Sequence, residues 1–151
     1  MKTNKKALNS LKVCFPSLSV NESAARAVVA AFSAQADPTT TELADIKCAV
    51  SEAVTNSIVH GYPDSIGNIY ISVQILEDRL IRIEIKDKGR GIEDIAKART
   101  PLFTTSPESE RSGMGFTVME SFTDKMKVRS KVGKGTTITL FKQLGERKKA
   151  E

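Results

Sequence analysis

The sequence predicts an α+β fold of two layers, with helices on one face of a mixed, mostly antiparallel sheet. Some segments alternate apolar and polar residues, as half-buried strands do, and others repeat apolar residues with the helical period. Their order along the 151 residues is β-α-α-β-β-loop-α-β-β. At this length, and with 40% apolar residues, we expect one domain over 1–151 with its own core and short basic tails at about 1–7 and 145–151.

The first strand and the first helix are predicted near the N-terminus. Apolar residues alternate over 11–15, and Pro16 ends the strand. Asn21 is the expected N-cap of an Ala-rich helix over about 22–36, which a following Asp-Pro pair interrupts. The apolar positions of this helix include Ala24, Ala27, Val28, Ala31 and Phe32.

The second helix carries a stronger start signal. Thr39, followed three residues later by Glu42, has the capping-box pattern, and the helix should run to about His60. One face of this helix should pack on the sheet, and its residues are Leu43, Ile46, Val50 and Ala53. Cys48 is expected to pack, or to face a neighbour, as a small apolar residue.

The C-terminal half should supply four strands and two shorter helices. A turn at 77–78 between two alternating segments predicts one hairpin, and a Gly-Lys-Gly turn at 133–135 predicts another. A loop-rich stretch, 87–113, follows the first hairpin. The predicted elements are strands over about 69–75, 80–85, 125–132 and 136–142 and helices over about 93–98 and 114–122.

The net charge of +5 suggests a nucleic-acid or anionic-membrane partner, but its distribution along the chain does not. Residues 1–12 contribute four lysines and no acid, and residues 146–151 contribute a further +1. Residues 13–145 hold 16 basic and 16 acidic side chains. Four basic residues alternate along the strand predicted at 125–132, where a solvated face is favoured over a nucleic-acid groove. We therefore expect no direct nucleic-acid binding and no membrane binding.

Composition excludes several other classes of protein. No apolar run approaches the roughly 18–20 residues of a membrane span, and the basic start lacks the apolar region and cleavage site of a signal peptide. Cys14 and Cys48 lie far apart and outside any CxxC or Cys/His cluster, so reduced thiols and a cytoplasmic location are expected. A single histidine, His60, argues against a structural zinc site.

Two motifs in the first hundred residues could carry chemistry. The second helix places Glu52, Asn56 and His60 on one stripe of its surface. Beside a polyphosphate, the carboxylate can serve as a base and the amide as a magnesium ligand. The alternative is that this stripe is a solvated helix face. At a strand end, Asp87 begins the sequence Asp-Lys-Gly-Arg-Gly. Its carboxylate can accept a hydrogen bond from an exocyclic amine such as N6 of adenine, although an ordinary Gly-rich turn has the same composition.

The third motif opens the last predicted helix. The sequence Ser-Gly-Met-Gly at 112–115 leaves free N–H groups at a helix start, and such groups favour phosphate binding. The guanidinium of Arg111 can bind a terminal phosphate oxygen. The alternative is that these glycines only cap the helix. Upstream, 100–105 mixes hydroxyls with a Leu-Phe pair, as a mobile lid anchored at one point would. Together the motifs indicate one ATP site, of a design without the Walker A loop or the HRD and DFG loops of ordinary protein kinases.

On these segments the chain resembles the GHKL (Bergerat-fold) ATPases, and within them the anti-sigma serine kinases of sporulating Gram-positive bacteria. The resemblance covers about residues 8–142. Its main segments are SEAVTNSIVHGY at 51–62, DKGRG at 87–91, PLFTT at 101–105 and ERSGMGFTVME at 110–120, with NESAAR at 21–26 and GTT at 135–137 in support.

The resemblance implies a role for each matched residue. Glu52 would be the general base that takes the proton of a substrate serine, and Asn56 would bind Mg²⁺ that bridges the ATP phosphates. Asp87 would hydrogen-bond adenine. The rest of the adenine pocket would include Gly89, Gly91 and Thr136. The phosphates would be surrounded by Thr104, Thr105, Arg111, Ser112, Gly113, Met114 and Gly115.

The same resemblance implies an anti-sigma factor that is also an ATP-dependent serine kinase. It would bind the sporulation sigma factor F and phosphorylate a serine of an anti-anti-sigma factor, with ADP or ATP deciding the partner and a homodimer as the assembly. Arg26, exposed by periodicity, would lie on the partner surface, and His60 would be structural. The alternatives are a nucleotide-sensing anti-sigma module without turnover, a stress-response relative, and a detached ATPase domain of a histidine kinase or gyrase-like protein.

Overall fold

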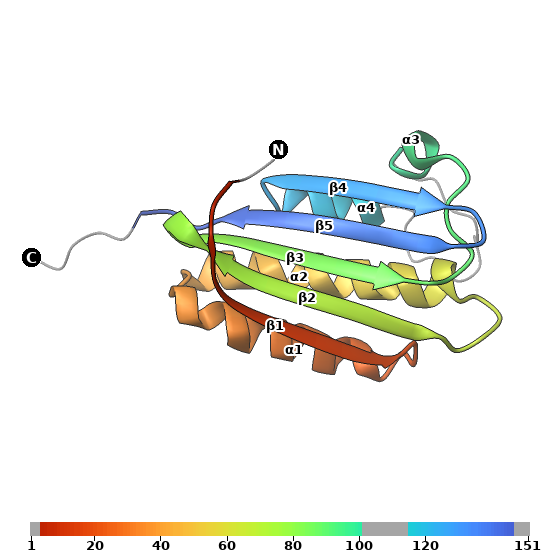
Figure 1. Cartoon of the computed structure of the whole chain (residues 1–151), viewed down its shortest axis with the longest axis horizontal. Coiled ribbons are helices and arrows are strands. Elements are labelled where there is room, and N and C mark those ends of the chain that lie inside the picture. The colour runs from red at the N-terminus through yellow and green to blue at the C-terminus, as the bar shows by residue number, and fades with distance from the viewer. Residues whose placement is uncertain (1–3, 101–114, 147–151) are drawn as a thin grey trace, which may run out of the picture.

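Five strands form one sheet in the computed structural model, which describes residues 4–100 and 115–146. The strands are β1 (Ala7–Pro16), β2 (Asn68–Leu76), β3 (Leu80–Asp87), β4 (Lys125–Lys131) and β5 (Gly135–Gln143). They lie in the order β1-β2-β3-β5-β4, and all four pairings are antiparallel (Figure 1).

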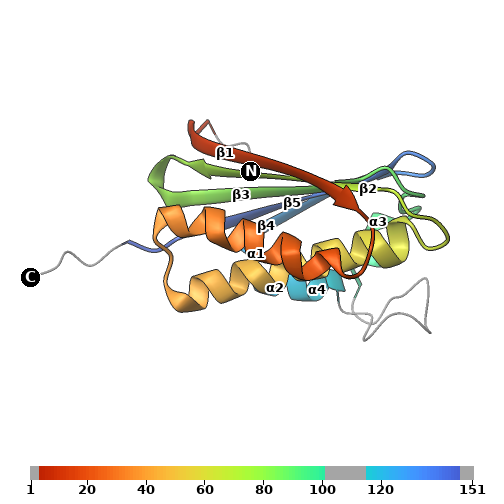
Figure 2. The same ribbon diagram turned by 90° about the horizontal axis from the view of Figure 1, so that it is seen from below.

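The helices are α1 (Asn21–Ser33), α2 (Thr40–Asn56), α3 (Ile95–Ala98) and α4 (Gly115–Ser121). Helices α1, α2 and α4 form a layer on one side of the sheet, whereas α3 stands at one end of it (Figures 1 and 2). The predicted two-layer α+β fold is therefore confirmed. Within the described residues, no helix is long and apolar enough to cross a membrane.

The core lies between the sheet and the helix layer. Alternate residues of β2, β3 and β5 turn toward the helices, and the largest of them that are fully buried are Ile69, Ile71, Ile81, Ile83, Ile85, Ile138 and Leu140. Helix α2 meets them with Ile46, Val50 and Ala53, which are buried as predicted, while Leu43 is half-buried. Burial of apolar surface at this interface is the main force that holds the two layers together.

The capping box of α2 is confirmed in full. Thr39 Oγ1 accepts a hydrogen bond from the Glu42 amide at 3.1 Å, and Glu42 Oε1 accepts one from the Thr39 amide at 2.9 Å. The second carboxylate oxygen of Glu42 accepts from the Gly145 amide at 2.8 Å, which ties the helix start to the end of β5. Cys48, on the same helix, is exposed and does not pack in the core.

Several predictions for the N-terminal elements are wrong. Strand β1 begins at Ala7, four residues before the expected start, because its pairing with β2 continues to Leu76. Asn21 does not cap α1: its Nδ2 donates to the Pro16 carbonyl at 3.0 Å, and no side chain caps this helix. Helix α1 ends at Ser33 and continues as a 3-10 turn, Ala34–Ala36.

The buried face of α1 also differs from the apolar positions named from the sequence. Of those positions, Phe32 is buried, whereas Ala24, Ala27, Val28 and Ala31 are exposed. The residues of α1 that face the core are Ala25, Val29, Ala30, Phe32 and Ser33. A helix with alanines on every side has no unique apolar stripe, so its orientation is decided by the larger side chains Val29 and Phe32.

Candidate functional site

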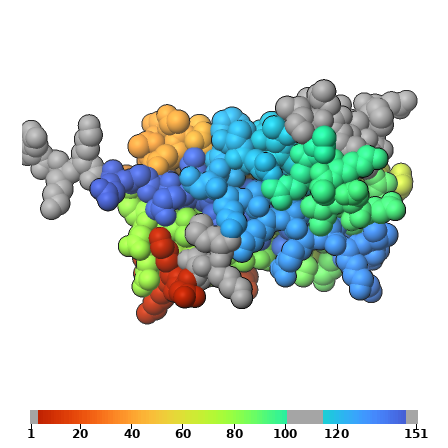
Figure 3. All heavy atoms as spheres, turned by 90° about the horizontal axis from the view of Figure 1, so that it is seen from above, coloured from red at the N-terminus to blue at the C-terminus, as the bar shows by residue number. Residues whose placement is uncertain are grey.

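A cleft of about 990 Å³ opens at the end of the molecule where α2 ends and β4 turns into β5. Its walls come from four places: the end of α2 with the turn after it, the loop and short helix over 90–100, the start of α4, and the end of β4. Figure 3 shows α3 and the loop before it, in green, lying against the β4–β5 hairpin, in blue. The volume is in the range of pockets that enclose small ligands.

Helix α2 does not run regularly to His60. It ends at Asn56 and continues as one π-helical turn, Ser57–Gly61, closed by a hydrogen bond of 3.0 Å from the Tyr62 amide to the Ser57 carbonyl. Such turns occur often at functional sites because the extra residue redirects the side chains that follow. Asn56 and His60 line the cleft. Glu52 is half-buried one turn earlier on α2, outside the cleft lining.

Asp87 is the buried acid of the site. It ends β3, is 2% exposed, and its carboxylate accepts three hydrogen bonds. Oδ1 accepts from the Gly89 amide at 3.0 Å and from the Thr136 amide at 3.2 Å, and Oδ2 accepts from Ser57 Oγ at 3.0 Å. Burial raises the pKa of Asp87, although the hydrogen bonds from Gly89, Ser57 and Thr136 oppose this shift by stabilising the carboxylate. The acid is thus held in one orientation by three separate segments.

Glycines allow these segments to approach one another. A Cβ on Gly61 would lie 2.9 Å from the Asp87 Cγ, and a Cβ on Gly89 would lie 2.0 Å from the Gly61 carbonyl oxygen. Gly91 has φ +79°, and a Cβ there would lie 2.3 Å from the Lys131 carbonyl oxygen. The resemblance assigned Gly89 and Gly91 to the adenine pocket; the structure adds that all three glycines stand where a Cβ would collide with Asp87 or with neighbouring backbone.

Two hydroxyl groups fasten the loop that follows Asp87. Tyr62 Oη accepts from the Lys88 amide at 2.6 Å and donates to the Asn68 carbonyl at 2.7 Å. Ser130 Oγ, on β4, accepts from the Ile92 amide at 2.7 Å and donates to the Gly135 carbonyl at 3.0 Å. The part of the cleft wall that Ile92 and Ser130 form is therefore held by hydrogen bonds within the protein.

The structure brings together part of the predicted site. Asp87, Gly89 and Thr136 surround one carboxylate, and Thr136, which is 4% exposed, is the cross-strand partner of Asp87. The described residues of the site that line the cleft are Asn56, Gly91 and Gly115. The remaining phosphate-binding candidates, Thr104, Thr105, Arg111, Ser112, Gly113 and Met114, lie outside the described residues, as does most of the proposed lid.

Sequence reasoning missed Ser57, Tyr62 and Ser130. Ser130 had a usable signal, because it is the polar residue on the face of β4 that otherwise carries Met126 and Val128. Ser57 had none, since its partner is 30 residues away in sequence. Arg26, predicted to be exposed, is only partly so: its Nη1 donates to Glu22 Oε1 at 3.2 Å and to Ser51 Oγ at 3.3 Å.

Comparison with known proteins shows the family to which the chain belongs. The family model described as the histidine kinase-like ATPase domain matches residues 15–142. The anti-sigma F factor of Anoxybacillus flavithermus is 55% identical over 141 residues, which cover 93% of this chain and 96% of that protein. The anti-sigma F factor of Caldanaerobacter subterraneus is 56% identical over 137 residues, which cover 91% and 95%.

Solved structures share the fold at low identity. The crystal structure of the RsbU and RsbW domains of Rv1364c from Mycobacterium tuberculosis superposes with a TM-score of 0.66 at 21% identity, covering 92% of this chain and 33% of that one. The blue-light activated histidine kinase EL346 of Erythrobacter litoralis superposes with a TM-score of 0.56 at 17% identity, covering 78% and 40%.

Proposed function

The chain belongs to the family of anti-sigma F factors, built on a histidine kinase-like ATPase domain, and on that premise we propose that it is an anti-sigma factor controlled by ATP. The finer proposal is that it inhibits the sporulation sigma factor F and phosphorylates a serine of an anti-anti-sigma factor. ADP or ATP in the cleft would then decide which protein partner binds. We further propose that it acts in the cytoplasm as a homodimer.

One observation carries the nucleotide proposal: Asp87 is a buried carboxylate whose Oδ2 has one hydrogen-bond donor, Ser57 Oγ. Asp87 is not itself among the residues that line the ligand-sized cleft, but Asn56, which directly precedes Ser57, is. Oδ2 of Asp87 retains lone-pair capacity for the exocyclic amine of adenine, because a carboxylate oxygen accepts two hydrogen bonds. With adenine on Asp87, the triphosphate would extend toward Asn56 and the start of α4 at Gly115, both of which line the cleft. Free N–H groups at a helix start favour phosphate.

The residues present fit a magnesium ion that travels with the nucleotide. Asn56 supplies an amide oxygen to the cleft lining, and Mg²⁺ prefers hard oxygen ligands, keeps several waters and takes the rest from phosphates. A single protein ligand is therefore sufficient. When bound, the ion would neutralise charge on the phosphates during transfer.

In the proposed reaction the chain mainly positions the reactants. The substrate serine Oγ attacks the γ-phosphorus, the bond from that phosphorus to the bridging oxygen of ADP breaks, and the serine proton passes to Glu52. Glu52 and Asn56 lie one turn apart on α2, so a base and a metal ligand come from one rigid element. Phosphoryl transfer needs little more than such positioning and charge stabilisation.

A second candidate function is a nucleotide-sensing anti-sigma module without turnover. It is favoured by the place of Glu52, which lies outside the cleft lining while Asn56 lies within it. The protein should be incubated with labelled Mg-ATP and a candidate anti-anti-sigma protein, and phosphoserine measured. The kinase proposal expects transfer by the wild type and none by Glu52→Gln, which should still bind ATP. ATP binding without transfer by the wild type would establish the sensing module instead.

A further inference from the structure

The face of the sheet that points away from the helices, here called the open face, is defined by the strand register. Lys142 of β5 donates to Asp45 of α2 at 2.9 Å, so Lys142 faces the helix layer and its neighbours Phe141 and Gln143 face away. Cross-strand partners share a face of a sheet. The pairings then assign to the open face Ser10, Lys12, Cys14, Tyr70, Ser72, Gln74, Leu76, Leu80, Arg82, Glu84, Lys86, Lys125, Lys127, Arg129, Lys131, Thr137, Thr139, Phe141 and Gln143.

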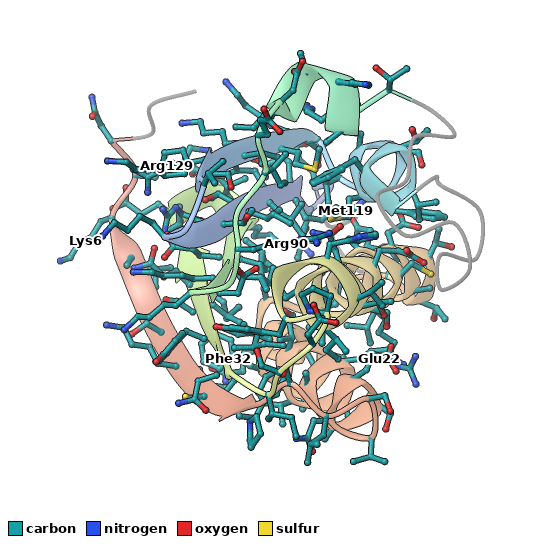
Figure 4. All side chains as sticks on the ribbon, turned by 90° about the vertical axis from the view of Figure 1, so that its right-hand side faces the viewer. Lys6, Glu22, Phe32, Arg90, Met119 and Arg129 are labelled. Atoms are coloured by element: carbon teal, nitrogen blue, oxygen red, sulfur yellow. The ribbon has the colours of Figure 1, made fainter. Side chains whose placement is uncertain are left out.

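This face concentrates the positive charge of the protein. Its basic residues are Lys12, Arg82, Lys86, Lys125, Lys127, Arg129 and Lys131. Among the open-face residues that the register assigns, the acid is Glu84, which pairs with Arg82 at 3.2 Å. Lys88 extends the patch, since its Nζ lies 5.1 Å from the centre of the Tyr70 ring. Figure 4 shows Arg129 and Lys6 on this side of the sheet and Glu22 on the opposite side.

The balance of 16 basic and 16 acidic residues over 13–145 therefore hides a separation of charge across the sheet. The sequence expectation of no nucleic-acid ligand depended on that balance and on interpreting the basic residues at 125–132 as a solvated strand face. A sum over the chain carries no information about faces, whereas the register does. Two copies of this face would also repel each other, which argues against its burial between identical subunits.

The cations form rows with hydroxyl groups between them. Along β4 they recur every second residue, about 6.7 Å apart, and the cations of β3 form a second row two strands away, about 10 Å. Arg129 is the cross-strand partner of Thr137, and Thr137 is the cross-strand partner of Lys86. The Thr137 side chain therefore lies between these two cations in one line across the sheet. Arg129 and Lys86 are both exposed.

The large aliphatic and phenyl side chains that the register assigns to the open face are covered rather than presented, and Tyr70 is half-buried beside Lys88. Phe141 is 2% exposed, with Arg82 Cζ and Lys127 Nζ lying 6.0 Å and 5.7 Å from its ring centre, and Leu76 and Leu80 are buried. A protein partner would normally find an apolar or aromatic centre surrounded by charge, and a membrane-binding face would present apolar groups for insertion. A chain of phosphates requires only cations and hydrogen-bond donors.

We propose that the open face binds the phosphate backbone of duplex DNA without reading base sequence. Binding would rest on counterion release and would fall steeply with salt. It uses no residue of the nucleotide cleft, so it can be tested separately from ATP binding.

The test measures binding of a fluorescein-labelled DNA duplex by anisotropy between 50 and 200 mM salt. The variant Lys86→Gln/Arg129→Gln should bind about tenfold or more weakly at the lowest salt, and the slope of log K against log salt should lessen by about 1.8, because two phosphate contacts are lost. The control Arg26→Gln/Lys47→Gln removes the same charges from the helix layer and should keep the wild-type slope. Both variants should keep the wild-type circular dichroism spectrum.

Three results would overturn the proposal. The first is no binding by the wild type at 50 mM salt, and the second is equal loss in the two variants, which would reflect net charge alone. The third is tighter binding of anionic lipid vesicles or of poly-glutamate than of the duplex, which would identify a membrane or an acidic protein as the partner.

Discussion

Replacing Asp87 by Asn separates the hydrogen bonds that this residue accepts within the protein from the one that we propose it accepts from adenine. An asparagine has the same shape, and its Oδ1 can still accept from the amides of Gly89 and Thr136. Its Nδ2 would replace Oδ2 and donate to Ser57 Oγ. All three internal hydrogen bonds can therefore persist, and the fold should remain intact.

The stability effect has a defined sign. The pKa of Asp87 is raised above 3.8 in the folded protein, so between these two values the folded state binds more protons than the unfolded state. The wild type therefore loses stability as the pH rises through this window, and the loss is complete above the raised pKa. The neutral Asn carries no such cost. At pH 7, Asp87→Asn should unfold at the same temperature as the wild type or a higher one, and the difference should shrink as the pH falls toward 4.

Nucleotide affinity should change in the opposite direction. The adenine amine would meet a donor instead of an acceptor, and the loss of a hydrogen bond to a charged group costs about 1.5–3 kcal/mol, or roughly ten- to hundredfold in Kd. Calorimetric titration with ATP and thermal unfolding at pH 7 and 5 measure both effects. As a control, Asp87→Ala orphans two buried amides and should cost about 2–6 kcal/mol of stability. Wild-type ATP affinity in Asp87→Asn would refute the assignment of this carboxylate to adenine.

Three further predictions concern the frame of the cleft. Gly91→Ala should lower the free energy of unfolding by about 1–3 kcal/mol more than Gly133→Ala. Both glycines have φ near +78°, but a Cβ at Gly91 would collide with the Lys131 carbonyl oxygen, whereas a Cβ at Gly133 would have no atom within 4 Å. Equal losses in denaturant titrations would contradict this collision. Tyr62→Phe should cost about 0.5–1.5 kcal/mol for each of its hydrogen bonds to the Lys88 amide and the Asn68 carbonyl, because water can reach both exposed groups; an unchanged melting temperature would count against this. Thr39→Ala should cost about 0.5–2 kcal/mol through loss of the N-cap, whereas Asn21→Ala should not show a capping loss; equal helix losses by circular dichroism would reverse that distinction.

Elements whose signals are local could be predicted from the sequence. The capping box of α2 uses two residues three apart, and both hairpins follow from alternation on either side of a short turn. Asp87 was singled out because it stands where an apolar strand ends, and it is a buried carboxylate there; its contact with a ligand stays a prediction. In each case the residues that create the structure are neighbours in the chain.

The rest depends on contacts between distant segments. Asn21 is a residue type that favours N-cap positions, but its side chain donates instead to the carbonyl of Pro16, which lies beside it at the end of β1. The π turn after Asn56 satisfies no local preference; it directs Ser57 toward a carboxylate 30 residues away. The row of basic residues at 125–132 could be recognised in the sequence, but only the register shows that Lys86 of β3 lies on the same face as Arg129.

The position of the last strand in the sheet has a consequence for synthesis on the ribosome. Strand β5 comes last in sequence among the described elements, yet it lies inside the sheet between β3 and β4. Until it emerges, β3 presents an open edge that can pair with other nascent chains. A product terminated before Gly135 would also lack the Thr136 amide that holds Asp87. The hydrogen-bonded frame around Asp87 is therefore completed only after β5 has been synthesised, and products that end before β5 should be handled by the cell as unfolded chains.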